Sequence, residues 1–345
     1  MLGGPDHPEA RRQASRTRML FIGSLILLLL LAMDVGSGAA ALSWPQIWNT
    51  LAAPQAAGAA EQFIVWELRL PQALMALLAG AALGLAGAEM QTVLDNPLAS
   101  PFTLGVSSAA ALGAALSLAL GVHIPGVPAQ YAIAANAFIM ALLCSLMLDQ
   151  AARSLRMAQQ GIVLLGIALV FGFNALLALI QLVSDAAALQ NLLYWMMGSL
   201  GASRWPDIAL LGGVFLATAA ASMAQAWPLT ALRFGEERAG SFGIDTRRVR
   251  RWALLRVSLL AATTVALVGV IGFVGLIAPH IARRLWGEDH RWYLPASACV
   301  GAIILLAASV CAKQLTTHVE IPAGIVTTLV GIPFFIVVLA RRRVH

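Results

Sequence analysis

Side chains that could do chemistry are sparse in this 345-residue chain, and they are not arranged as in an active site. Lys313 is the only lysine, and it lies outside any Gly-x-x-x-x-Gly-Lys-Ser/Thr loop of the kind that binds the phosphates of ATP. No His-x-x-x-His pair occurs, and no serine or cysteine nucleophile stands beside a plausible base. The sequence therefore predicts no catalytic residue, no cofactor and no metal site, and any ATP-driven work must be powered by another chain.

The longest hydrophilic stretch inside the chain, residues 228–251, is the second candidate for function. It mixes both charges with small residues, and its glycines divide it into two short helical pieces. One interpretation is an ordinary solvated loop. The other is a docking element that inserts into a cleft on a cytoplasmic partner.

Composition places these residues in a membrane protein. Hydrophobic residues make up 60% of the chain and charged residues 11%, whereas a soluble domain carries about 25% charged residues. A span needs roughly 20 residues, so the apolar runs allow about ten transmembrane helices. The sequence predicts an all-α polytopic fold, with a polar tail over residues 1–18 and one transmembrane domain over residues 19–343.

The distribution of basic residues predicts the topology. With ten spans and a cytoplasmic amino end, all but three of the 22 lysines and arginines lie on the cytoplasmic side. The exceptions are Arg69, Arg204 and Lys313. This asymmetry favours two cytoplasmic termini and explains the formal charge of +6 without a nucleic-acid partner. A signal peptide cleaved near residues 38–41 is the alternative interpretation of the first apolar run.

Turn-forming and small residues indicate how the spans connect and pack. Two prolines and an asparagine in residues 95–101 prevent helix continuation there. Small residues at helix-packing spacing predict close helix contacts on two faces. These faces carry Gly80, Gly84 and Gly87 in one span, and Gly269, Gly272 and Gly275 in another.

Five stretches in this order resemble the permease subunits of bacterial ABC importers for iron–siderophore complexes, haem and cobalamin. The resemblance extends from about residue 64 to residue 343. The stretches are Leu68-Arg69-Leu70-Pro71, then Asn96-Pro97-Leu98-Ala99-Ser100-Pro101 with Leu104-Gly105-Val106-Ser107-Ser108, then Glu237-x-Ala239-x-x-x-Gly243, then Gly272-Phe273-Val274-Gly275-Leu276-Ile277-Ala278-Pro279-His280, and finally Glu320-Ile321-Pro322-Ala323-Gly324 with Gly331-Ile332-Pro333.

The resemblance implies a set of partners. Two permease subunits, either two copies or two homologues, would surround a central pathway, with two cytoplasmic ATPase subunits below and a periplasmic substrate-binding protein above. The chain itself would be a transport subunit and not an enzyme, in the bacterial inner membrane.

The resemblance also implies roles for single residues. Arg69 and Lys313 match positions where the family uses basic residues to meet glutamates on the binding protein. The pathway gate would be formed by Asn96, Leu98, Gln159 and Gln160. Coupling to the ATPase would involve Arg233, Gly235, Glu236, Glu237, Ala239 and Gly243.

Cargo is assigned by resemblance alone. The variant Met90-Gln91-Thr92-Val93-Leu94, with residues 99–104, favours a ferric siderophore, followed by haem and then cobalamin. A proton-coupled secondary transporter is less favoured. Such transporters keep ionisable groups near the bilayer midplane, whereas acidic residues here fall at the ends of predicted spans.

Overall fold

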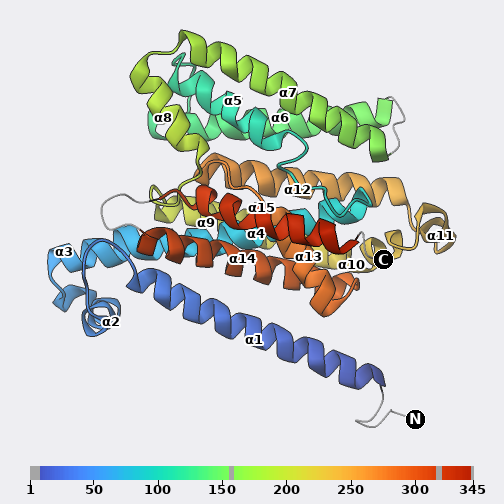
Figure 1. Ribbon diagram of the computed structural model, residues 1–345, viewed down its shortest axis with the longest axis horizontal. Coiled ribbons are helices and arrows are strands. Elements are labelled where there is room, and N and C mark those ends of the chain that lie inside the picture. Colours follow the sequence, from blue (N-terminus) through green and yellow to red (C-terminus); the bar gives the residue numbers. More distant parts are fainter. Residues whose placement is uncertain (1–7, 155–158, 316–320, 343–345) are drawn as a thin grey trace.

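The computed structural model describes residues 8–154, 159–315 and 321–342, and this part of the chain is helical and contains no strand. The long helices lie along the long axis of the molecule (Figure 1), which confirms the predicted all-α fold. The long elements are α1 (Pro8–Gly36), η2 (Phe63–Arg69) with α4 (Leu70–Val93), α5 (Val106–Leu118), α6 (Ala132–Ser154), α7 (Gln159–Val183), α9 (Trp205–Ala224), α12 (Thr246–Val268), α13 (Val274–Trp286), α14 (His290–Leu315) and α15 (Ala323–Arg342).

Short helices connect these elements at the two ends of the bundle. They are α2 (Trp44–Ala52), η1 (Pro54–Ala56), α3 (Ala59–Gln62), η3 (Ala129–Tyr131), α8 (Ala186–Met196), α10 (Ala226–Leu232) and α11 (Glu236–Ser241). In Figure 1, α10 and α11 lie at the end of the molecule where α1 begins and α15 finishes, and α2 and α3 lie at the opposite end. We call these the inner and the outer end.

Seven helices of the described residues are long and apolar enough to cross a membrane, and α5 and α15 are shorter apolar helices. Between α12 and α14 the chain runs from one end of the bundle to the other as the non-helical residues 269–273 followed by α13. This crossing starts where Gly198 packs on the carbonyl of Val270 and finishes where the indole of Trp286 donates to the carbonyl of Arg16 at 3.1 Å. The polytopic fold and the alternating direction of its spans agree with the sequence prediction.

Contacts between distant segments show which helix ends meet at the outer end and which meet at the inner end. This grouping agrees with the topology that the distribution of arginine predicted. At the outer end, the Arg69 guanidinium donates to backbone carbonyls in the last turn of α1 and just after it, and the indole of Trp205 donates to the carbonyl of Trp66 at 3.0 Å. At the inner end, Arg233 pairs with Asp95 at 3.0 Å. The predicted even number of crossings is therefore consistent with which ends meet.

Helix α4 lies at the centre and packs most closely against α14. A Cβ on Gly80 would collide with the carbonyl of Gly301, and one on Gly84 with the carbonyl of Ser297. The same holds for Gly87 against the backbone of Gly275 in α13. Bare backbone at these positions lets the helices approach closely, as the glycine spacing predicted.

The second predicted glycine face is wrong as a helix face. Gly269 is the residue after α12 and has φ +71°, so it ends that helix, and Gly272 lies in the non-helical connection. Only Gly275 belongs to a helix, α13. Positive φ costs little in glycine, and this explains why the chain breaks there and does not continue a packed span.

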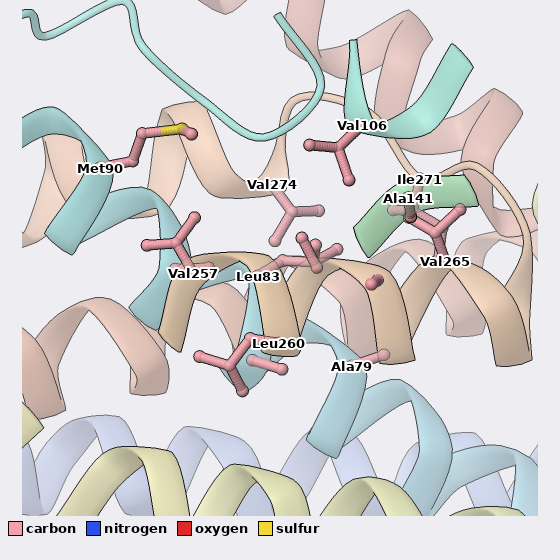
Figure 2. Packing of buried hydrophobic residues seen from close by; sticks show 14 of the residues in the cluster. Ala79, Leu83, Met90, Val106, Ala141, Val257, Leu260, Val265, Ile271 and Val274 are labelled. Atoms are coloured by element: carbon pink, nitrogen blue, oxygen red, sulfur yellow. The ribbon is translucent and has the colours of Figure 1, made fainter. Parts of the chain in front are cut away.

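The buried core joins α4 to the helices α5, α6 and α7 through α12. Figure 2 shows side chains of five elements meeting in this core. Its labelled members are Ala79, Leu83 and Met90 of α4, Val106 of α5, Ala141 of α6, Val257, Leu260 and Val265 of α12, Ile271 of the connection and Val274 of α13. Because α12 contacts both α4 and α6, it holds the two groups together.

A π-helical turn, η2, precedes α4. Pro71 has no N–H to give to the carbonyl four residues earlier, and its ring crowds that carbonyl. The backbone widens instead, and the N–H of Leu70 bonds to the carbonyl of Val65 five residues back. The wider turn carries Arg69 inward, where its side chain is 4% exposed.

Candidate functional site

The inner end carries the hydrophilic segment as two short helices, α10 and α11, as the sequence predicted. Gly235 separates them with φ +97°, a conformation that other residues rarely adopt, and Gly243 follows α11 with φ +78°. A Cβ on either glycine would meet no atom within 4 Å. The glycines therefore serve the turns of the backbone, and both face open space.

The segment differs from its predicted limits at both ends. α10 starts at Ala226, two residues before the predicted start, and α12 begins at Thr246, so the last six predicted residues belong to a span. Ala239 is fully buried, and its carbonyl accepts the N–H of Ile244 at 3.2 Å. Ala239 thus holds the fold of the segment and is not presented at its surface.

Exposed aromatic side chains cover the segment, and sequence reasoning missed them. Phe234 is 56% exposed, while Trp227 and Phe242 are each 61% exposed. They extend from the inner end alongside the exposed charges of Glu237 and Arg238. Their signal in the sequence was Trp227 just before the polar stretch 228–251, with Phe234 and Phe242 inside it. Large exposed apolar groups rimmed by charge are typical of protein interaction sites.

Arg233 is turned away from this surface and bridges two acidic residues. Its guanidinium bonds to Asp95 at 3.0 Å and to Glu288 at 2.6 Å, and Arg283 lies 3.7 Å from the Glu288 carboxylate. Partial burial raises the pKa of Glu288, but the hydrogen bond and charge of Arg233, with the charge of Arg283, outweigh burial and leave that pKa below its ordinary value. Glu236 pairs with Arg250 of α12.

Two buried polar groups lie behind the segment, and neither was predicted as a site. In the first, the His290 ring lies 2.8 Å from the Thr92 hydroxyl and 3.2 Å from the Thr230 hydroxyl, joining α14, α4 and α10. In the second, Arg256 of α12 pairs with Glu89 of α4 at 3.0 Å. Both groups sit inside spans, where an unpaired charge is costly.

The predicted gate turn connects α4 to α5. The Asn96 side-chain oxygen accepts the N–H of Leu98 at 2.9 Å, which fixes a tight turn that leaves Leu98 38% exposed. α7 begins at Gln159, but the side chains of Gln159 and Gln160 are outside the described part of the chain. Leu104, just after the turn, packs on Gly166 of α7. The gate role of these residues stays a prediction.

The predicted docking cations are buried at the outer end. Lys313 donates to the Asp34 carboxylate at 2.8 Å, and its side chain is 5% exposed. Arg69 donates to the carbonyl of Val35 at 3.1 Å and also to those of Gly36 and Ala40. Their docking role is untested, but in this structure both side chains hold the end of α1 against α4 and α14.

Comparison with known proteins agrees with this arrangement. The model of the FecCD transport family matches residues 25–341. The chain is 36% identical to the hemin transport system permease protein of Yersinia pestis over 320 residues, covering 92% of this chain and 94% of that protein. It is 37% identical to the vitamin B12 import system permease protein of Vibrio cholerae over 335 residues, covering 97% and 96%.

A solved structure has the same fold. It is the inward-facing conformation of a transporter assigned to the metal-chelate type of ABC transporters. The match has a TM-score of 0.83 at 30% identity and covers 94% of this chain and 99% of that one. The family model spans most of the chain, and the relatives match nearly end to end. The chain therefore belongs to the FecCD transport family, as a multi-pass membrane permease of an ABC importer and not itself an ATPase.

Proposed function

We propose that this permease moves a ferric siderophore into the cell, driven by two ATPase subunits that dock on α10 and α11. The observation that carries the proposal is the inner surface of these helices. Three aromatic side chains, Trp227, Phe234 and Phe242, are more than half exposed there. In a soluble environment such a group needs a covering partner, and the family supplies one in the ATPase.

The work of the permease is conformational. ATP binding would close the ATPase pair and displace α10 and α11, and the spans would follow by alternating access. The chain contributes position and movement, while the chemistry of ATP hydrolysis belongs to the partner. A second permease subunit, identical or homologous, would complete the pathway, and the gate would use Asn96, Leu98, Gln159 and Gln160.

A periplasmic binding protein would deliver the cargo to the outer end. Arg69 and Lys313 remain the predicted docking residues. To meet glutamates on that protein, each would exchange an internal acceptor for one on the partner, since both are bonded within this chain. The outer surface offers Arg204 as a more exposed cation, at 46% of its side chain, paired with Asp207 at 3.1 Å.

Support for the siderophore is indirect. It rests on the sequence variant at residues 90–94 and 99–104, and on the likeness to a transporter of the metal-chelate type. Haem and cobalamin are the competing cargoes, because relatives are named for hemin and for vitamin B12. Proton-coupled transport has less support, since Asp34 and Glu89, the two most deeply buried acids of the described residues, are each paired with a cation.

Docking on the ATPase can be tested by removing the exposed rings. The double variant Phe234→Ala and Phe242→Ala should insert normally but lose most co-purified ATPase and most ATP-driven uptake. Phe63→Ala is the matched control, because Phe63 is also 56% exposed but lies at the outer end. ATPase retention equal to that of the control would contradict docking at this surface.

Cargo is tested in vesicles holding the assembled complex with its binding protein. Uptake of an iron-55-labelled siderophore, haem and cyanocobalamin would be compared with and without ATP. Siderophore uptake that needs ATP supports the full proposal. ATP-dependent uptake of only haem or cobalamin keeps the importer and replaces the cargo.

A further inference from the structure

The end of α4 and the turn that follows it carry three polar residues, each tied to the α10 region. Glu89 and Thr92 are three residues apart, which places them on one face of α4, and Asp95 lies in the turn after the helix, with φ +42°. Glu89 and Thr92 are each connected to a residue at α10 through a side chain of another element, whereas Asp95 pairs directly with the residue that follows α10. We call these three connections the polar ladder, and its rungs are Glu89–Arg256–Gln225, Thr92–His290–Thr230 and Asp95–Arg233.

The first rung lies deepest. Arg256 Nε lies 3.0 and 3.1 Å from the two carboxylate oxygens of Glu89, and its Nη1 donates to the Gln225 side chain at 3.1 Å. Glu89 is 1% exposed and the Arg256 side chain 7%. Gln225 is the single residue between α9 and α10. The guanidinium therefore joins α4 to the hinge from which α10 departs.

The second rung meets α10 at its middle. His290 is fully buried, and its two ring nitrogens face the Thr92 and Thr230 hydroxyls at 2.8 and 3.2 Å. The backbone N–H of His290 also donates to the Thr230 hydroxyl, at 3.0 Å. One small side chain of α10 thus holds two bonds to the start of α14, and through the ring to α4.

The third rung is at the surface and meets the end of α10. Arg233 follows the last residue of α10 and pairs with Asp95, whose side chain is 65% exposed. Asp95 has φ +42°, a conformation that a small acidic residue tolerates, and it directly precedes the gate turn. Salt screens this rung more than the two buried ones.

The order of the rungs gives the ladder a direction. Residues 89, 92 and 95, at and just after the end of α4, connect in the same order to residues 225, 230 and 233, so α10 runs beside the end of α4. A shift of α10 must then either carry the end of α4 with it or break buried hydrogen bonds. Arg233 Nε and Arg256 Nη2 are buried and have no hydrogen-bond partner among the described residues.

We propose that the buried rungs, Glu89–Arg256–Gln225 and Thr92–His290–Thr230, are positioning residues that transmit displacement of α10 to the gate turn at residues 95–101. This inference rests on the proposed function, because it needs an ATPase that moves α10. In this proposal, the two buried rungs carry out the step between ATP binding and movement of the gate. Energetic coupling between distant sites is carried by packed side chains and hydrogen-bond networks of this kind.

The test uses the assembled complex in vesicles, with Thr230→Val and Thr92→Val as near-isosteric variants that delete one hydroxyl each. Thr264→Val is the matched control, because Thr264 is a buried threonine of α12, as Thr92 is of α4, but bonds only within its own helix, to Leu260 at 2.7 Å. We expect each ladder variant to hydrolyse ATP at near the control rate. Cargo imported per ATP should fall by about threefold to thirtyfold. Since both variants break one rung, the double variant should be little worse than either single one.

A second measurement separates transmission from simple stapling. Spin labels on Phe102→Cys, which is exposed beside the gate turn, report the distance between the two permease subunits with and without trapped ATP, in a background lacking the native cysteines. ATP should change this distance in the control and not in the ladder variants.

Each outcome decides the proposal. Ladder variants that move the label and import cargo like Thr264→Val would overturn it while leaving the proposed function intact. Ladder variants that fail to assemble, when the control assembles, would show a structural staple and would also overturn it. A wild-type complex without ATP-driven uptake would instead refute the proposed function.

Discussion

At the scale of single residues, the outer ion pair has a measurable structural role. Lys313→Met leaves the Asp34 carboxylate buried and unpaired, since Asp34 is fully buried and its second oxygen has no partner in the described chain. Breaking a buried pair from one side costs about 3–5 kcal/mol. We expect a clearly lower melting temperature in detergent, and recovery of most of the loss when Asp34→Leu is added.

Arg204→Met is the control for this prediction, because the Arg204 side chain is 46% exposed although Asp207 is not, and an ion pair with an exposed cation contributes about 0–1 kcal/mol. The same variants separate the two roles of Lys313. If Lys313 serves docking, Lys313→Met slows association with the binding protein and leaves the melting temperature unchanged. That pattern would contradict the structural role.

Glu288 gives the inner end a defined pH dependence. Its pKa lies below the ordinary value of 4.5, because Arg233 and Arg283 outweigh the effect of partial burial. A lowered carboxylate pKa contributes stability above about pH 4.5, and the contribution is lost as pH falls through the lowered pKa. Glu288→Gln should therefore be less stable than wild type at neutral pH, and the difference should vanish in acid.

Thermal unfolding in detergent at a series of pH values measures this difference. Glu237→Gln is the control, because Glu237 is an exposed carboxylate of α11 outside the Arg233 cluster. A deficit of Glu288→Gln that persists below the lowered pKa would mean that the carboxylate charge is not what stabilises the cluster.

At the scale of elements, the sequence predicted what depends on hydropathy and on small residues. The apolar runs indicated an all-α membrane protein with many spans, and Gly80, Gly84 and Gly87 correctly indicated close helix packing. The face through Gly269 and Gly272 failed, because Gly269 has positive φ and ends α12, and Gly272 lies in the non-helical connection. Spacing alone does not distinguish a packing glycine from a terminating one.

The polar pairs inside spans were beyond sequence reasoning. Glu89 appeared as an acid at a span end, yet it is buried against Arg256, which lies 167 positions away in the chain. Lys313 and Asp34 are 279 positions apart. Only the three-dimensional packing of α4, α12, α14 and α1 brings these partners together. The sequence therefore identified the charged residues but not the ion pairs that they form.

At the scale of the whole molecule, the two ends have different designs. The outer end uses its cations internally, to hold α1 through Arg69 and Lys313. The inner end leaves aromatic and charged groups exposed and keeps its polar connections beneath them. A displacement of the inner end by a cytoplasmic partner would therefore act first on helices that polar contacts connect. The glycines between α4 and α14 give the bundle a close-packed centre.

The gate provides the last prediction, because it depends on two permease subunits facing each other. Leu98 is exposed in a turn fixed by Asn96, and Gln159 and Gln160 open α7 at the same end. Two copies of these residues would narrow the exit, and glutamine amides can hydrogen-bond across the gap. Truncating Leu98, Gln159 and Gln160 to alanine should leave ATPase activity largely intact and let cargo leak from loaded vesicles without ATP.

The leak is measured as cargo lost from sealed vesicles, against vesicles with wild-type complex and against Phe102→Ala. Phe102 is the control because it is exposed close to the turn but lies outside the proposed constriction. Leakage from the triple variant alone assigns the seal to the turn and the start of α7. If the triple variant holds cargo as tightly as wild type, the narrow point of the pathway is formed by other residues, and the roles inferred from the family fail at these positions.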